Sequence, residues 1–259
     1  MLLKVYILSV VITAIFSFYI WEIVSAITFP DGNGPAISFL SNFGTYTIQV
    51  LMSTSCFIGI QKISKCLINK VKLIKIWFLG NDYVDGYWVG YLTKSYKSED
   101  GIVKKDRLVI EYIKQSATDI LIDGWAYDMD SINPTRISYW TSQGYPIQVK
   151  NGKLIFGYNT KFYNVNIELV PEVTTGFVYY DLRTAIDEKE TQHNIPNELS
   201  GYFINLLEND KNDLHMKKVV KSYDKYRREC KRNGEKPLEK IPYFLKLAKT
   251  FYESYSVRD

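Results

Sequence analysis

The residues best suited to chemistry in this sequence do not form a catalytic or metal-binding pattern. Only His193 and His215 are present as histidines, and the three cysteines are scattered without a C-x-x-C pair, so zinc ligation is not expected. No P-loop and no G-x-S-x-G turn occurs. The aspartates between Asp119 and Asp130 have the spacing of strands and turns, and we interpret them as a solvated face. The sequence predicts a protein that is not an enzyme and has neither a resident cofactor nor a metal.

Charge is distributed unevenly along the chain, and this limits the kind of ligand. The net charge is +4, but acidic residues outnumber basic ones between residues 77 and 210, whereas residues 211–259 are strongly basic. Binding of a nucleic-acid polymer depends on many contacts from Lys and Arg to phosphates. The acidic centre therefore excludes a general polyanion-binding surface and is compatible with a small anion held by a few local donors.

Two apolar stretches, at residues 5–27 and 37–60, predict membrane-spanning helices within an N-terminal domain of residues 1–79. Each is longer than the roughly 20 helical residues that cross a bilayer, although a cleaved signal peptide is the alternative for the first stretch. Five lysines between Lys62 and Lys75 follow the second stretch. The positive-inside rule then predicts a multi-pass protein of the bacterial inner membrane with both termini in the cytoplasm.

The second stretch also predicts contact between helices. Asn42, Gln49 and several hydroxyl residues interrupt its apolar sequence. In lipid, such side chains bond to a neighbouring helix, which favours a homo-oligomer, or they bond back to their own helix.

From residue 80 to 208 the hydrophobic period changes to two. Tyr163, Val165, Ile167 and Leu169 alternate with polar residues, as in a strand with one buried face. Turn-rich segments separate the candidate strands without a helical pattern between them, which predicts a small cytoplasmic antiparallel β-barrel of eight or so strands. The predicted strands are residues 86–96, 107–116, 119–128, 137–142, 147–150, 154–160, 162–170, 175–182 and 200–206.

Residues 209–259 predict a basic C-terminal helical hairpin. Apolar residues recur at helical spacing from Asp213 to Arg232 and again from Leu238 to Tyr255, with Asn233-Gly234 at the turn. These apolar stripes either pack against the barrel or bind a membrane or a partner.

The first predicted strand begins with Gly86-Tyr87-Trp88-Val89-Gly90-Tyr91, a G-x-W start like that of lipocalin-type barrels. The glycines allow strands to approach closely, and the indole fills one end of the barrel. Behind two apolar stretches and a row of lysines, this strand resembles the two-transmembrane β-barrel (lipocalin-like) effectors of the bacterial anti-phage systems known as CBASS. The resemblance covers residue 5 to about residue 206, and the basic tail departs from it.

The resemblance implies a function as an anti-phage defence effector. Its barrel would bind a cyclic di- or oligonucleotide made by a CD-NTase-like nucleotidyltransferase. The ligand would control oligomerisation of the transmembrane helices, which act on the lipid bilayer and disrupt the inner membrane in abortive infection. The alternatives are an effector held inactive by the nucleotide and a membrane-anchored adaptor whose barrel binds a protein partner.

A cyclic nucleotide needs flat aromatic faces for its bases and cations or amide donors for its phosphates. Arg107 and Arg136 are the only arginines before Arg183. Each aromatic residue of the region has core or interface packing as its alternative role. The candidate ligand-binding residues are Tyr91, Arg107, Tyr127, Arg136, Tyr139, Trp140, Lys153, Tyr158, Asn159 and Thr160.

Overall fold

The computed structural model divides the chain into two units, which are described separately. One unit comprises residues 1–78 with 116–118, and the other comprises residues 79–115 with 119–259. The structure describes residues 7, 10–19, 22, 35–98, 101–116, 118–129, 134–163, 169–184, 195–206, 211–219 and 222–256.

The first unit is helical. Residues 10–19 form a short helix, α2 covers Pro35–Lys70, and α3 covers Lys72–Leu79. The hydroxyl of Ser17 donates a hydrogen bond to the hydroxyl of Ser53 on α2, at 3.2 Å. Ile68 and Phe78 are buried against each other at the end of this unit.

The predicted membrane spans are wrong. In the part of the chain that the structure describes, no helix combines the length and the apolarity needed to cross a membrane. In the first predicted stretch the structure describes residues 7, 10–19 and 22, and the remainder lies outside the described residues. Helix α2 is long, but hydroxyl and amide side chains recur along it from Ser38 to Gln61, and polar residues oppose transfer into hydrocarbon. The predicted multi-pass placement in the inner membrane is wrong for the same reason.

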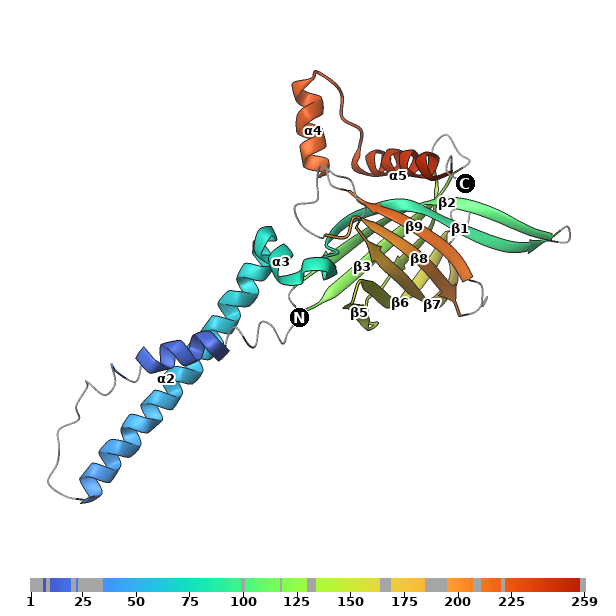
Figure 1. The fold of residues 1–259 in the computed structure, drawn as a ribbon. Coiled ribbons are helices and arrows are strands. Elements are labelled where there is room, and N and C mark those ends of the chain that lie inside the picture. The colour runs from blue at the N-terminus through green and yellow to red at the C-terminus, as the bar shows by residue number, and fades with distance from the viewer. Residues whose placement is uncertain are drawn as a thin grey trace. The chain divides into compact units, whose positions relative to one another are not determined.

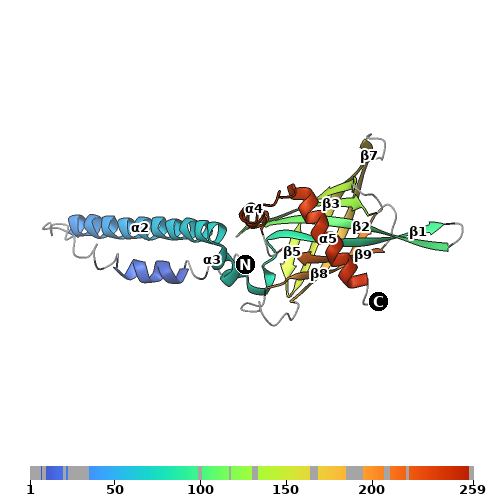
Figure 2. The same cartoon turned by 90° about the horizontal axis from the view of Figure 1, so that it is seen from above.

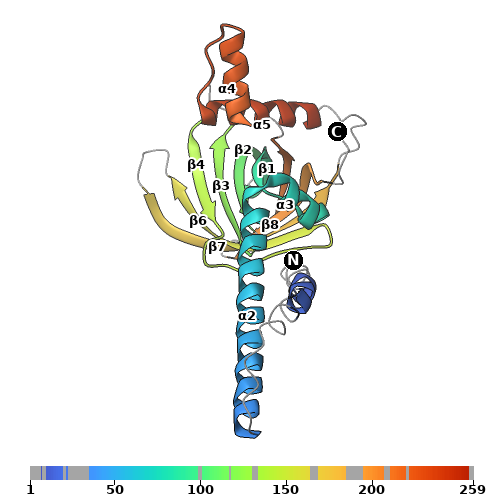
Figure 3. The ribbon, with the colours of Figure 1, turned by 90° about the vertical axis from the view of Figure 1, so that its left-hand side faces the viewer.

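The second unit is built on a β-barrel. Among the described residues, nine antiparallel strands form one sheet in the order β4-β3-β2-β1-β9-β8-β7-β6-β5, and a pairing of β4 with β6 closes it into a ring of eight (Figure 1). Figure 3 shows β4, β3, β2 and β1 side by side. The strands are β1 Gly86–Ser98, β2 Gly101–Gln115, β3 Ile120–Asp128, β4 Arg136–Thr141, β5 Ile147–Lys150, β6 Lys153–Tyr163, β7 Leu169–Arg183, β8 Glu198–Asn205 and β9 Lys211–Lys218.

Closure depends on how two short strands share one partner. Strand β5 pairs with the first part of β6, from Lys153 to Phe156, and β4 pairs with its later part, from Asn159 to Phe162. The two short strands therefore continue the same edge of β6, one after the other. Together they leave the long strand β6 paired along most of its length, which removes the exposed edges that an open sheet would present.

The eight-stranded barrel expected from the sequence is present, with two differences. The centre of the predicted strand 162–170 lies outside the described residues, and β7 begins at Leu169. The predicted helix from Asp213 is wrong at its start, because Lys211–Lys218 is strand β9, paired between β1 and β8. The interior residues Leu214 and Met216 are two apart, which fits a strand, and the ring needs a strand at this position to join β1 to β8.

The interior of the barrel is one continuous core. Trp88 is fully buried in it, and its indole N–H donates to the carbonyl of Val84 at 2.8 Å, so the ring fills one end with its polar atom satisfied. Gly90 allows the close strand approach expected from the sequence, since a Cβ at this position would collide with the backbone of β9 at His215 and Met216.

A second core lies on the outer face of the barrel. The C-terminal helices are α4, Tyr223–Arg232, and α5, Lys240–Ser256, and α5 lies across β1 and β2 (Figure 2). The ring of Phe244 stacks on Tyr87 with centroids 4.5 Å apart, and the hydroxyl of Tyr252 donates to Asp106 at 2.8 Å. Of the alternatives for this apolar stripe, packing against the barrel is the one that the structure shows for α5.

Candidate ligand-binding site

A cavity of about 50 Å³ lies inside the barrel, between the interior faces of seven strands. A water molecule needs about 10–15 Å³ on this scale. The cavity therefore has room for a few water molecules or one small head group, and it is too small for a whole cyclic dinucleotide. Its walls combine aromatic, hydroxyl, amide and charged side chains, which distinguishes it from the apolar core beside it. The side chains that line it with polar or aromatic groups are Lys94, Arg107, Glu111, Ser138, Trp140, Tyr158, Thr160, Phe162, Thr174, Phe203 and Asn205.

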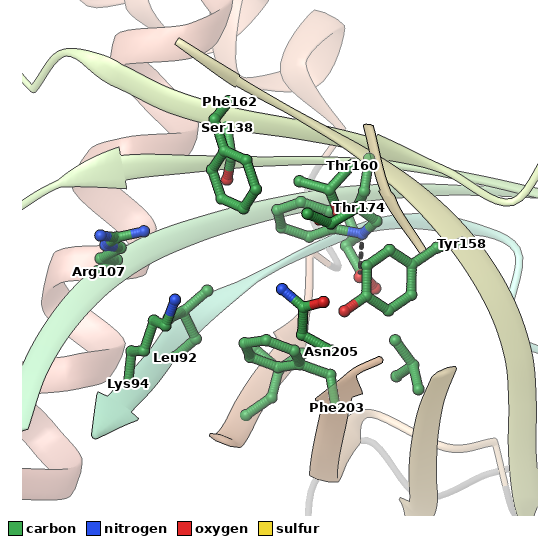
Figure 4. Close-up of a pocket in the computed structure, with 14 residues that line it drawn as sticks. Leu92, Lys94, Arg107, Ser138, Tyr158, Thr160, Phe162, Thr174, Phe203 and Asn205 are labelled. Atoms are coloured by element: carbon green, nitrogen blue, oxygen red, sulfur yellow. Dashed lines mark hydrogen bonds between the residues drawn. The ribbon is translucent and has the colours of Figure 1, made fainter. Parts of the chain in front are cut away.

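The two cations of the cavity come from neighbouring strands. Arg107 on β2 lies opposite Leu92 on β1, and Lys94 follows two residues later on the same face of β1. The side chain of Lys94 is buried, whereas Arg107 is half-buried. Figure 4 shows both cations on one side of the cavity and Tyr158 on the other. The cavity is therefore polarised, with its positive groups at one end.

Two glycines make room for the aromatic rings of the opposite wall. A Cβ at Gly124 on β3 would occupy the position of the Trp140 indole, and a Cβ at Gly176 on β7 would collide with the hydroxyl end of Tyr158. Any larger residue at these two positions would force the ring to move from its place. Phe203 meets Tyr158 edge to face, with centroids 6.5 Å apart. The wall is therefore a set of packed, fixed aromatic faces.

Glu111 is the carboxylate of this cavity, and it is fully buried. Its Oε1 accepts a hydrogen bond from the indole N–H of Trp140 at 3.0 Å and another from the hydroxyl of Tyr180 at 2.9 Å. Burial raises the pKa of Glu111 to about 7, although the hydrogen bonds from Tyr180 and Trp140 lower it in part. Burial, with the nearby carboxylate of Glu111, holds the pKa of Tyr180 well above its usual range. Near neutral pH Glu111 is therefore present in both protonation states: its ionised form only accepts hydrogen bonds, and its protonated form can also donate one.

Two oxygen atoms of the cavity wall, Oε2 of Glu111 and Oγ1 of Thr174, are buried and have no hydrogen-bond partner among the described residues. Most buried polar groups in proteins are paired, and an unpaired one costs about 1–3 kcal/mol or more. Both atoms therefore mark positions where a bound polar molecule would lower the free energy of the folded protein.

Four of the ten ligand-binding residues predicted from the sequence line this cavity. They are Arg107, Trp140, Tyr158 and Thr160. Each lies on the interior face of its strand, as does Trp88 at the end of the barrel. The structure brings these four together from three strands that are separated along the chain.

Strand alternation places most of the remaining six on the outer face. Tyr91 and Tyr127 lie in the aromatic packing beneath the C-terminal helices. The hydroxyl of Tyr139 donates to Asp123 at 2.9 Å, and Asn159 accepts a hydrogen bond from Tyr145 at 2.7 Å. Lys153 lies over the ring of Tyr179, 5.4 Å from its centroid.

Arg136 differs from these five. It lies two residues before the interior residue Ser138 on β4, so regular alternation would place its side chain inside the barrel. A register shift between Ala126 and Tyr127 on β3 pairs Arg136 with the outward-facing Tyr127. Its guanidinium lies over the ring of Tyr163, 4.2 Å from the centroid. The irregularity in the ladder therefore removes Arg136 from the interior.

Sequence reasoning missed several residues of the cavity. Among them are Lys94, Glu111, Ser138, Phe203 and Asn205. The sequence pattern could have identified two of them. Lys94 lies an even number of residues from the interior residues Trp88 and Leu92, and Glu111 lies two residues from both Val109 and Ile113, so alternation places both on the interior face. Charged residues at interior positions of an otherwise apolar face point to a functional interior.

The chain matches no protein-family model, and no curated protein or solved structure matches it significantly. Within the described ranges, no group of three His, Cys, Asp or Glu side chains could hold a metal ion. The site is therefore described by its own geometry, as a cavity with polar and aromatic walls inside a small antiparallel barrel.

Proposed function

We propose that this protein is a receptor whose barrel binds a small ligand with a planar head group and a phosphate, and that the ligand class is a cyclic di- or oligonucleotide. The observation that carries the proposal is the polarised cavity, with Lys94 and Arg107 at one end and the rings of Trp140 and Tyr158 in its walls. Aromatic faces favour nucleobases, and a guanidinium favours phosphate through its planar pair of N–H donors.

The size of the cavity sets how such a ligand would bind. About 50 Å³ accommodates part of one base, so in this proposal the pairing edge of a single base enters the cavity. The phosphates and the rest of the ring stay at the cationic end, near Lys94 and Arg107. The ligand then needs few cations, which agrees with the net acidic sequence of the barrel.

The proposed role is that of a non-enzymatic effector in anti-phage defence, with a CD-NTase-like nucleotidyltransferase as the source of the ligand. Binding would shift the equilibrium between separate and associated copies of the chain. A ligand does so only through different affinities for the two forms. Sedimentation of the full chain with and without ligand tests this step, and it also distinguishes an effector that assembles on binding from one that is restrained by it.

Calorimetric titration of the full chain with cyclic dinucleotides of guanine, of adenine and of both bases tests the receptor itself. The variants Arg107→Lys and Lys94→Gln should each weaken binding by roughly tenfold, as expected for the loss of one charge-assisted hydrogen bond. The matched controls Arg136→Lys and Lys153→Gln change cations outside the cavity and should bind as the parent does. Equal losses in all four variants, or no binding of any cyclic nucleotide to the parent, would contradict the proposal.

A further inference from the structure

Glu111 is an unusual residue for the interior of a barrel. Its side chain has no exposed surface, and its two oxygens have different surroundings. Oε1 accepts hydrogen bonds from both Trp140 and Tyr180, whereas Oε2 has no partner among the described residues. A carboxylate oxygen has about two lone pairs, so Oε1 is saturated and Oε2 is the atom left for a ligand.

The position of Oε2 defines what it would bind. Glu111 is the only carboxylate among the described residues that line the cavity. The surrounding rings of Trp140, Tyr158 and Phe203 suit a flat group rather than a branched one. Above its pKa Glu111 is ionised, and an ionised carboxylate only accepts hydrogen bonds, so under that condition the atom that meets Oε2 must be a donor. A planar heterocycle with an N–H on its edge satisfies both conditions.

We propose that Oε2 of Glu111 accepts a hydrogen bond from an N–H on the edge of the ligand's base, and that the barrel thereby selects guanine over adenine. This inference rests on the proposed function. Guanine presents its N1–H and its amino group side by side on the pairing edge. Adenine presents an acceptor, N1, at the corresponding position, and two acceptors facing each other repel.

Thr174 supports the same placement. Its Oγ1 is also buried in the cavity wall without a hydrogen-bond partner among the described residues, and the residue is 5% exposed. A hydroxyl can donate or accept, so it can bond to a further polar atom on the rim of the base. Enzymes that bind an extruded base read it in a comparable way, with hydrogen bonds to its pairing edge and aromatic packing against its faces.

The test compares guanine and adenine cyclic dinucleotides on the parent chain and on Glu111→Gln at about pH 8, above the pKa of about 7 of Glu111. The glutamine keeps the shape of the side chain and an acceptor for Trp140 and Tyr180, but it replaces Oε2 by an amide donor. The parent should bind the guanine ligand at least about tenfold more tightly than the adenine ligand. In Glu111→Gln this preference should vanish or invert, because the new amide can donate to N1 of adenine. Glu198→Gln, on β8 outside the cavity, is the matched control and should keep the parent's preference.

A ligand-side measurement makes the result independent of the folding of any variant. A guanine cyclic dinucleotide methylated at N1 lacks the proposed donor and should bind the parent at least about tenfold more weakly. If the parent binds guanine and adenine forms equally, or if Glu111→Gln keeps the guanine preference, Oε2 is not the acceptor and the carboxylate has a structural role, while the receptor proposal stands. If no cyclic nucleotide binds to the parent, the receptor proposal and this inference fail together.

Discussion

The indole nitrogen of Trp140 lies 3.0 Å from Oε1 of Glu111, across 29 positions of sequence. Trp140 is on β4 and Glu111 is on β2, with β3 between them in the sheet. The contact is possible because Gly124, on β3, has no side chain to fill the space that the indole occupies. A tryptophan, a carboxylate and a glycine on three successive strands thus form one unit in the cavity wall.

Replacing Trp140 by phenylalanine should destabilise the protein by about 1–3 kcal/mol at pH 8 and by less at pH 5. The variant loses the indole donor, and hydrogen bonds to an ionised carboxylate are stronger than those to a neutral one. Urea unfolding at the two pH values measures the difference. Trp125→Phe, on the outer face of β3, is the control and should show no such pH dependence. An equal loss for Trp140→Phe at both pH values would show that Glu111 is not the partner that matters.

The pKa of Glu111 makes the stability of the fold depend on pH. Its pKa in the folded protein is about 7, against an ordinary value of 4.5, so the folded state binds this proton more tightly than the unfolded state does. The stabilisation from this proton is fully present below about pH 4.5 and is lost as the pH rises through about 7. Relative to the parent, Glu111→Gln should therefore gain roughly 3 kcal/mol between pH 4.5 and about pH 8.

Urea unfolding of the parent and of Glu111→Gln across this range checks the sign as well as the size. Glu111 accepts hydrogen bonds from Trp140 and Tyr180, and the cavity lining also includes the cations Lys94 and Arg107. Only the difference between the two proteins isolates Glu111 from the other titrating groups. A difference that stays constant with pH would mean that Glu111 keeps an ordinary pKa.

Truncating Phe244 to alanine should destabilise the protein by about 3–5 kcal/mol, the usual cost of removing a buried aromatic ring. Phe244 is 2% exposed and stacks on Tyr87 of the barrel. The matched control is Ile241→Ala on the same helix, where the side chain is 50% exposed, and it should cost less than about 1 kcal/mol. Thermal or urea unfolding compares them. Similar small effects of both variants would show that α5 is not an integral part of the barrel's outer core.

Replacing Gly124 by alanine should displace the Trp140 indole and destabilise the protein by more than about 1 kcal/mol. A double-mutant cycle gives the clearest measurement, because the added methyl would enter the space that Trp140→Ala leaves empty. The cost of Gly124→Ala should therefore fall sharply in the Trp140→Ala background. The same cost in both backgrounds would mean that the glycine is needed for its backbone and not for the space above it.

Local sequence patterns predicted much of the barrel. Strand β5, Ile147–Lys150, has the bounds expected from its apolar alternation and flanking turns. The start at Gly86 and the buried Trp88 also follow from residue types, because glycine allows close strand approach and an indole needs volume and one acceptor. These features depend on neighbours a few residues apart, and such information is contained in the sequence.

The errors arose where a local pattern had more than one physical solution. The apolar residues from Leu214 onward fit a helical stripe, but Leu214 and Met216 belong to β9, since the ring requires a strand between β1 and β8. The apolar stretches near the N-terminus were long enough for membrane spans, but no described helix is apolar enough to be one.

The sequence by itself determined the alternation that forms the strands and the residue types available to a site. Only the tertiary structure decided which face of each strand becomes the interior, which placed Arg107 and Trp140 in the cavity and Tyr139 and Asn159 outside it. The physical reason is that alternation gives two faces without saying which one the closed ring will enclose. The surroundings of Glu111 are likewise a tertiary property, because its partners Trp140 and Tyr180 are 29 and 69 residues away in sequence.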